Sequence, residues 1–185
     1  MAGPVVAAAV ILNPERPIAG LADSKTLSET KRNQLFKTIA ENALSWSITE
    51  ASVAEIDKLN ILQATLLAMR RAVESLAIAP DQIKVDGLYL PHCAIPGEAI
   101  IKGDSKIQAI SAASILAKVH RDYLMAGYQQ TYPQFSFHVH KGYGTRQHLA
   151  EIEQFGILDL HRKTFNPVKK ILAADERKHK ANLIR

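Results

Sequence analysis

The stretch AIIKGDSKIQAISAASILAKVHRD, from Ala99 to Asp122, contains the features that decide the fold. It begins as an apolar strand that stops at Gly103, and it continues as a helix whose first residues are small. Asp104 lies between these two elements, with a lysine two residues away on each side. A carboxylate in that position can cap a helix, pair with a lysine or hold a metal ion.

The rest of the chain predicts an α/β protein with a mixed sheet. The run VVAAAVIL, Val5 to Leu12, is uncharged and predicts a strand buried on both faces. Alternation predicts a second strand in SWSITEASV, and shorter strands end before Gly87 and Gly103. Apolar residues at helical spacing predict helices over 26–43, 56–76, 111–128 and 147–155, with a basic helix at the C-terminal end. Strands and helices that alternate in this way form layered folds.

Composition limits the function classes. The chain has 185 residues, of which 47% are hydrophobic and 22% charged, as expected for one globular domain with a real core. Its single cysteine, Cys93, cannot form an internal disulfide, so we expect a reducing, cytoplasmic location. No Cys/His spacing suggests zinc, and the longest apolar run, of eight residues, is too short to span a membrane.

Positive charge is concentrated at the C-terminal end. The formal net charge is +5, and residues 161–185 contain eight Lys and Arg against two Asp and Glu. This segment is either a solvated helix or an electrostatic contact for a polyanion such as nucleic acid. The charge pattern predicts a domain over residues 1–160 and a basic helical extension over residues 161–185.

Two aspartates follow neighbouring predicted strands. Asp86 comes at the end of one strand, beside Gly87, and Asp104 follows the next. The carboxyl ends of parallel strands meet at one edge of a sheet, where α/β proteins bind ligands. Two carboxylates there repel each other unless a cation lies between them, and Mg²⁺ prefers such ligands. The alternative is that each Asp is an ordinary turn residue.

Other residues are suited to phosphate or sugar. Ser111 and Ser114 begin the predicted helix after Asp104, and Lys118 follows one turn later. A helix N-terminus attracts phosphate, although plain N-capping needs only one of these serines. Lys25 precedes another helix and offers a second cation.

A loop rich in histidine and glycine contains a candidate stacking residue. In HVHKGYGT, Tyr143 could stack on a base or sugar, and His138 with His140 could ligate a metal; an ordinary polar loop is the alternative. Paired carboxylates, phosphate contacts and a basic tail together favour metal-dependent phosphodiester hydrolysis.

Several motifs resemble those of one family. GPVVAAAVIL, LADSKTLSETKR, KGDSKIQAISAASILAKVHRD, HKGYGT and HRKTFNPVK occur in the order found in bacterial ribonuclease HII, and the likeness covers nearly the whole chain. The resemblance implies a ribonuclease H-like mixed sheet flanked by helices, with a C-terminal helical extension. It implies cleavage of the RNA strand of RNA–DNA hybrids, and nicking 5′ of ribonucleotides embedded in duplex DNA. The implied cofactor is Mn²⁺ or Mg²⁺, held by four carboxylates.

The resemblance also assigns roles to individual residues. Asp86 and Asp104 match two of the four catalytic metal ligands. The residues that match positions along the substrate are Tyr143, which packs on the ribose, and Lys25, Ser111, Ser114 and Lys118. We expect a monomer without membrane contact that acts in ribonucleotide excision repair and DNA replication, with its tail available to a sliding clamp.

The sequence departs from the family pattern at its start. The family begins with a strand that carries an Asp-Glu pair and a Gly-Arg-Gly turn, directly before the residues that match Ala2-Gly3-Pro4. The resemblance implies that this first, central strand is missing, which would leave a hydrophobic cleft between Val5–Leu12 and the strand ending at Asp86. One hypothesis is that Met1 is a start assigned inside a longer reading frame.

Two alternative functions remain open. A non-catalytic protein that binds hybrids would keep Tyr143, the serines and the basic tail, and would need no complete metal site. A sugar- or nucleotide-phosphate enzyme could use the same aspartates, but the absence of a P-loop and the basic tail argue against it.

Overall fold

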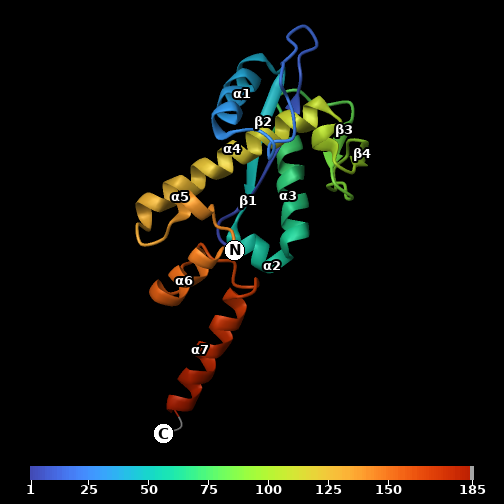
Figure 1. Cartoon of the computed structure of the whole chain (residues 1–185). Coiled ribbons are helices and arrows are strands. Elements are labelled where there is room, and N and C mark those ends of the chain that lie inside the picture. Colours follow the sequence, from blue (N-terminus) through green and yellow to red (C-terminus); the bar gives the residue numbers. More distant parts are fainter. Residues whose placement is uncertain (184–185) are drawn as a thin grey trace.

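The computed structural model describes residues 1–183, and of residues 175, 176 and 178–183 it describes the backbone alone. The elements alternate between helix and strand as the sequence predicts, and Figure 1 shows their arrangement. In chain order they are β1 (Val5–Ile11), α1 (Glu29–Asn42), β2 (Ser45–Ala51), α2 (Val53–Leu59), α3 (Ile61–Glu74), β3 (Ile83–Asp86), β4 (Gly97–Ile100), the 3₁₀ turn η1 (Gly103–Ser105), α4 (Gln108–Thr131), α5 (Phe137–His140), α6 (Arg146–Phe155) and α7 (Val168–Leu183). None of these described helices is long and apolar enough to cross a membrane.

The centre of the molecule is an antiparallel ribbon covered by helices on both faces. β1 pairs with β2 so that Val5 lies opposite Ala51. Successive side chains of a strand point to opposite faces, and those of β1 enter two different cores. Ala8 and Val10 pack with α1 and α4, whereas Ala7 packs with α2 and α3. Figure 1 shows the long helix α4 crossing this ribbon.

A third core joins the C-terminal elements to α4. Met125 of α4 is buried with Phe135, Phe137, Ile152 of α6 and Val168 at the start of α7. Beyond Val168, α7 extends away from the body (Figure 1). The loop before α7 belongs to the body, because His161 and Arg162 in it are buried.

The remaining strands form a second, separate sheet. β3 and β4 are parallel, with Asp86 opposite Ile100, so the two strands end at the same edge. The prediction of one mixed sheet is met only in part, because the described residues form two sheets of two strands each. Within them, β1 pairs only with β2 and β3 only with β4.

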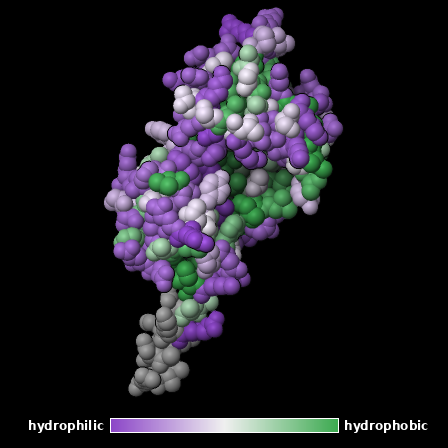
Figure 2. All heavy atoms as spheres, viewed as in Figure 1, coloured by the Kyte–Doolittle hydropathy of each residue, from purple (hydrophilic) through white to green (hydrophobic). Residues whose placement is uncertain are grey.

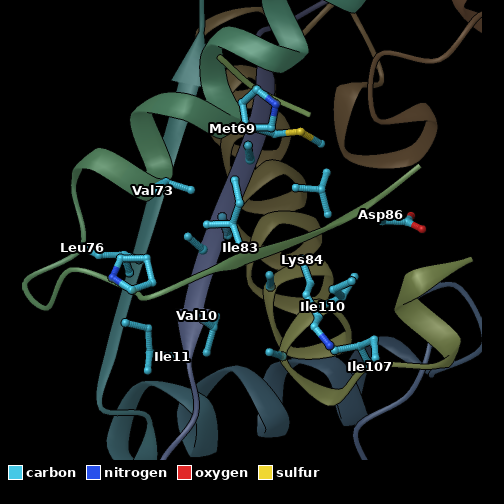
Figure 3. Close-up of a pocket in the computed structure, with 18 of the residues that line it drawn as sticks. Val10, Ile11, Met69, Val73, Leu76, Ile83, Lys84, Asp86, Ile107 and Ile110 are labelled. Carbon is cyan, nitrogen blue, oxygen red and sulfur yellow. The ribbon is translucent and has the colours of Figure 1, made fainter. Parts of the chain in front are cut away.

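A hydrophobic cleft separates the two sheets. It has a volume of about 700 Å³, and its walls come from β1, α3, β3 and the start of α4. Val10, Met69, Val73, Ile83 and Ile110 line it, as Figure 3 shows. In Figure 2 hydrophobic surface gathers in a hollow over α3. The cleft lies where the resemblance predicted one, and of the β1 side chains only Ala7 is buried.

Two helix predictions need correction. The helix predicted over residues 56–76 is two helices, because Asn60 adopts a left-handed φ of 72° and its side chain accepts a hydrogen bond from Gln63 N–H at 3.1 Å. With ψ at 165° the backbone leaves the helical path here, and the asparagine side chain caps the following helix. The helix predicted from Ser111 begins earlier, at Gln108.

Candidate active site

The two predicted carboxylates meet where β3 and β4 end; we call this the carboxylate edge, formed by Asp86 and Asp104. Asp86 is the last residue of β3, and its Oδ1 accepts a hydrogen bond from Gly103 N–H at 2.8 Å. Asp104 follows in η1. A Cβ on Gly103 would lie 2.6 Å from Ile110 Cδ1, so glycine permits this close approach.

Negative charge accumulates around Asp104. Its side chain is buried, and burial raises its pKa, as do the neighbouring charges of Asp86 and Asp23. Lys25 Nζ, 3.8 Å from Asp104 Oδ2, acts in the opposite direction. Asp23, a third acid beside Asp104, was not among the predicted site residues. Its position in the same loop as Lys25 was the available signal.

The loop before α1 directs Lys25 toward the carboxylate edge. Asp23 Oδ1 accepts a hydrogen bond from Lys25 N–H at 2.9 Å, and the Thr26 hydroxyl donates to Asp23 O at 2.8 Å. Arg32 on α1 donates to Ser24 O at 3.0 Å, which ties the loop to the helix. The Lys25 side chain therefore remains largely exposed while its ammonium group lies beside Asp104.

The three predicted substrate residues on α4 are in different environments. The Ser111 hydroxyl is buried and donates to Asp104 O at 2.6 Å, so it supports η1 from behind. Ser114, which lines the cleft, donates to Ser111 O at 2.9 Å. Lys118 is paired with Asp122 at 2.6 Å. Because α4 starts at Gln108, Ser111 and Ser114 do not form its N-terminus as the sequence predicted.

Tyr143 lies on a separate loop, residues 141–145, which we call the Tyr143 loop. Tyr143 is 57% exposed, and the backbone before it turns through positive φ angles at Lys141 and Gly142. The idea that His138 and His140 share a metal is wrong for this arrangement. His138 Nδ1 contacts Gln129 on the surface, whereas His140 is buried against Glu151.

Residues 1–4 pack beside the Tyr143 loop. The Met1 amino group donates to Gly142 O at 2.7 Å. Two arginines bind the carbonyls of this segment: Arg121 of α4 donates to Ala2 O at 3.1 Å, and Arg162 donates to Gly3 O at 3.0 Å. The N-terminal turns of α4 therefore support the carboxylate edge, and Arg121, near the middle of the helix, supports the segment beside the Tyr143 loop.

The carboxylate edge suits a single hard cation better than a closed metal cage. Among the residues that the structure describes, no group of three or more His, Cys, Asp or Glu side chains could hold a metal ion. Mg²⁺ commonly takes one or two protein carboxylates and completes its coordination with water and substrate phosphate. Asp86 and Asp104 provide that donor set, and the repulsion that raises the pKa of Asp104 is what a cation would relieve.

The comparisons with known proteins settle the family. The model of the Ribonuclease HII family matches residues 1–168. The chain belongs to the ribonuclease HII family. Membership confirms the resemblance seen in the sequence, and it places the chain among the ribonuclease H hydrolases.

Individual relatives agree with this membership. Ribonuclease HII of Chromobacterium violaceum is 57% identical over 177 residues, which cover 95% of this chain and 89% of the relative. The crystal structure of ribonuclease H2 from Pyrococcus horikoshii is 27% identical, with a TM-score of 0.71 over 91% of this chain and 92% of that one. The ribonuclease H-like fold predicted for the chain is therefore confirmed.

Two more distant structures share the fold. One is ribonuclease HII of Archaeoglobus fulgidus in complex with PCNA, at 20% identity and a TM-score of 0.66 over 89% of each chain. The other is Bst-RNase HIII in complex with Mn²⁺, at 19% identity and a TM-score of 0.69 over 95% of this ribonuclease HII chain and 66% of that chain.

Proposed function

We propose that this protein is an endoribonuclease that cleaves the RNA strand of RNA–DNA hybrids and nicks duplex DNA on the 5′ side of an embedded ribonucleotide. The observation that carries the proposal is the parallel pairing of β3 with β4, which brings Asp86 and Asp104 to one edge beside the ammonium group of Lys25. Hydrolysis of a phosphodiester there leaves a 5′-phosphate. Family membership supports the same activity.

We assign Asp86 and Asp104 as the ligands of Mn²⁺ or Mg²⁺. A divalent cation supplies Lewis acidity and lowers the pKa of bound water. The chain's own residues prepare that position: Gly103 N–H holds Asp86, and the Ser111 hydroxyl fixes the carbonyl of Asp104. Lys25, exposed at its tip, is available to a phosphate oxygen.

We assign recognition of the ribose to Tyr143. Its exposed ring offers a stacking surface, and the 2′-hydroxyl is the group that distinguishes RNA from DNA. Ser114 and Lys118 lie on α4 between Ser111 and Arg121. In this proposal, the nucleic-acid strand that runs from Asp104 to Tyr143 therefore passes both residues. A phosphate there would compete with Asp122 for Lys118.

We further propose that the fully active site includes one more strand in the hydrophobic cleft. Unpaired backbone groups of a strand edge require a partner when they are buried, and β1 and β3 each present such an edge within the described structure. The cleft walls are apolar, and Asp86 stands at one end of them. The strand that begins the family pattern, with its Asp-Glu pair and Gly-Arg-Gly turn, is a suitable occupant of the cleft.

Hybrid binding without cleavage is the second candidate function. It is favoured by the lack, among the described residues, of any group of three metal-binding side chains. Tyr143 and the cationic residues would then retain affinity for the substrate. Binding that is insensitive to Asp86→Asn and to a chelator would identify this case.

The remaining proposals concern partners. We propose a cytoplasmic monomer whose basic extension, residues 161–185, contacts nucleic acid and a sliding clamp. The Archaeoglobus fulgidus enzyme, solved with PCNA, is a fold relative that motivates the clamp contact. Ten of the 25 side chains of the predicted extension, those of residues 175, 176 and 178–185, lie outside the described residues, so this part of the prediction rests on charge.

The test is a gel assay for binding and nicking with Mn²⁺, on duplex DNA that contains one ribonucleotide. Three proteins are compared: the chain itself, the chain extended before Met1 by a strand with the Asp-Glu pair and the Gly-Arg-Gly turn, and the extended chain with Asp104→Asn. We expect nicking by the extended chain alone. Nicking by the chain itself would overturn the strand proposal. Binding without nicking in all three would favour the second function, and failure to bind would contradict both.

A further inference from the structure

Three buried histidines lie directly beneath the Tyr143 loop, and the catalytic proposal makes no use of them. His140 comes from α5, His148 from the first turn of α6 and His161 from the loop before α7. The rings of His140 and His148 are stacked, with centroids 4.0 Å apart and an angle of 8° between planes. His148 Nε2 lies 3.0 Å from His161 Nε2. None of the three is accessible to a substrate.

The hydrogen bonds fix where the protons lie on His148 and His161. Tyr143 O can only accept, so His148 Nδ1, at 2.8 Å, is the donor. Leu158 N–H donates to His161 Nδ1 at 2.8 Å, a shorter contact than the 3.3 Å from that nitrogen to Leu158 O. His161 therefore carries its proton on Nε2 and donates it to His148 Nε2. A directed series of hydrogen bonds thus runs from Leu158 N–H through both rings to Tyr143 O.

His140 holds the other side of the same loop. Its Nδ1 accepts a hydrogen bond from Gly142 N–H at 3.1 Å, and its Nε2 donates to Glu151 at 2.9 Å. The backbone carbonyl of His140 also accepts from Tyr143 N–H at 2.8 Å. The peptide groups on both sides of Tyr143 are therefore anchored to buried imidazoles or to α5.

The surroundings keep His148 and His161 neutral. Phe135 and Phe137 pack edge-on against His148. Burial lowers the pKa values of His148 and His161 to about 4, with smaller contributions from His140 and the Met1 amino group. Neutral imidazoles can each donate one hydrogen bond and accept one, which is what this series requires.

We propose that His148 and His161 are positioning residues that set the direction of the Tyr143 ring for ribose recognition. Because Tyr143 is exposed, the orientation of its peptide sets the direction of the Cα–Cβ bond from which the ring projects. This inference rests on the substrate role proposed above for Tyr143. A metal-binding role is not an alternative, since no suitable group of ligands occurs in the described part of the chain.

Two substitutions at His148 separate positioning from simple packing. His148→Phe keeps the aromatic shape and removes the donor to Tyr143 O, whereas His148→Asn places an amide N–H near the position of Nδ1. Loss of one hydrogen bond corresponds to about a 3- to 10-fold effect. The quantity to measure is the ratio of the affinities for a duplex with one ribonucleotide and for an all-DNA duplex. We expect His148→Phe to lower this ratio by that factor, and His148→Asn to retain most of it.

A double-mutant cycle with Tyr143→Ala tests whether the effect passes through the tyrosine. If it does, His148→Phe causes no further loss of preference once Tyr143→Ala is present. Equal losses in both backgrounds would overturn the proposal and leave His148 a packing residue. His161→Phe, with His161→Gln as its matched control, repeats the test at the hydrogen bond between His161 and His148. This second pair of variants keeps the proposal testable if His148→Phe does not fold.

Amide hydrogen exchange tests the inference independently of any substrate. We expect His148→Phe to raise exchange within residues 141–146 and to leave β1 and β2 unchanged, and we expect His148→Asn to resemble the original chain. Unchanged exchange in residues 141–146 would overturn the inference. A different pair of results would contradict the proposed role of Tyr143 instead. In that case the original chain shows no preference for the ribonucleotide, although His148→Phe raises exchange in the loop as expected.

Discussion

The carboxylate edge and the Tyr143 loop depend on different parts of α4, and the two regions are preorganised to different degrees. At the carboxylate edge, one backbone N–H holds Asp86, and the carboxylates repel each other beside an open cleft. At the Tyr143 loop, histidines anchor the peptide groups around the tyrosine, and Arg121 and Arg162 hold the adjoining segment. The carboxylate edge therefore has few hydrogen bonds of its own beside the cleft, whereas the Tyr143 loop is held by hydrogen bonds on several sides.

This difference indicates that recognition and cleavage are separable properties of the molecule. If the Tyr143 loop reads the sugar as proposed, it does so from a preformed conformation, and its contribution to substrate binding should not depend on a metal. In the proposed mechanism, the carboxylate edge contributes to cleavage only when a cation joins the two aspartates. Substitutions in the two regions should therefore have different signatures.

The largest effect is expected from Asp104→Asn in the strand-extended chain. Removal of one metal ligand should lower cleavage by about 10³-fold or more, because metal-assisted charge stabilisation is worth several kcal/mol. Affinity for the uncleaved duplex should change little, which can be measured by gel shift. Asp159→Asn, an exposed carboxylate at the other end of the molecule, is the control. Retained turnover in Asp104→Asn would show that Asp104 only shapes the turn.

Acid should weaken the Tyr143 loop and its core. The pKa values of His148 and His161 are lowered from 6.5 to about 4, so below pH 6.5 the unfolded chain takes up protons that the folded chain refuses. Stability is therefore complete above pH 6.5 and is lost as the pH falls toward 4, by about 3 kcal/mol for one such histidine. Urea unfolding at a series of pH values measures this slope. His148→Phe should flatten it, and an unchanged slope would assign the effect to other groups such as Glu151.

Tyr143→Ala should affect substrates unequally. Stacking of a base or sugar on an aromatic ring is worth about 1–3 kcal/mol, or roughly 5- to 150-fold. We expect that loss in kcat/KM at a single embedded ribonucleotide and a much smaller one on a long hybrid, where many positions can be cleaved. Tyr123→Ala, which removes a highly exposed tyrosine from α4, is the matched control. An equal loss on both substrates would argue against recognition at the junction.

Two glycine substitutions should have small effects in opposite directions. A Cβ at Gly103 meets Ile110 at 2.6 Å, whereas a Cβ at Gly127 in α4 meets nothing within 4 Å. Gly103→Ala should lower stability by about 1 kcal/mol or more and also reduce cleavage. Gly127→Ala should raise stability by up to about 1 kcal/mol and leave cleavage unchanged. Thermal unfolding compares the two, and a stable, active Gly103→Ala would show that the carboxylate edge tolerates displacement.

The carboxylate pair could be predicted from the sequence because local signals and one topological rule were sufficient. A strand that ends at Asp86, a second that stops at Gly103 and a parallel arrangement place both acids together. The exposure of Tyr143 could also be predicted, because the glycines beside it indicate a surface loop. These features depend on short stretches of chain and on the order of the elements.

Other features depend on contacts between distant residues. The pairing of His148 with His161 requires α6 and the following loop to fold onto Phe135, and no spacing in the sequence indicates it. Asp23 reaches Asp104 only through the path of a loop. The break at Asn60 was hidden because apolar residues continue at helical spacing on both sides of it.

The free edge of β1 also affects how the protein behaves at high concentration. An unpaired strand edge can be extended by any chain that offers its own backbone groups, including a second copy of itself. The run from Val5 to Leu12 contains neither a charge nor a proline, the residues that usually prevent such pairing. We therefore expect the protein to form β-rich aggregates when its solution is concentrated, unless the cleft is filled. A strand bound in the cleft would cover this edge and keep the protein soluble.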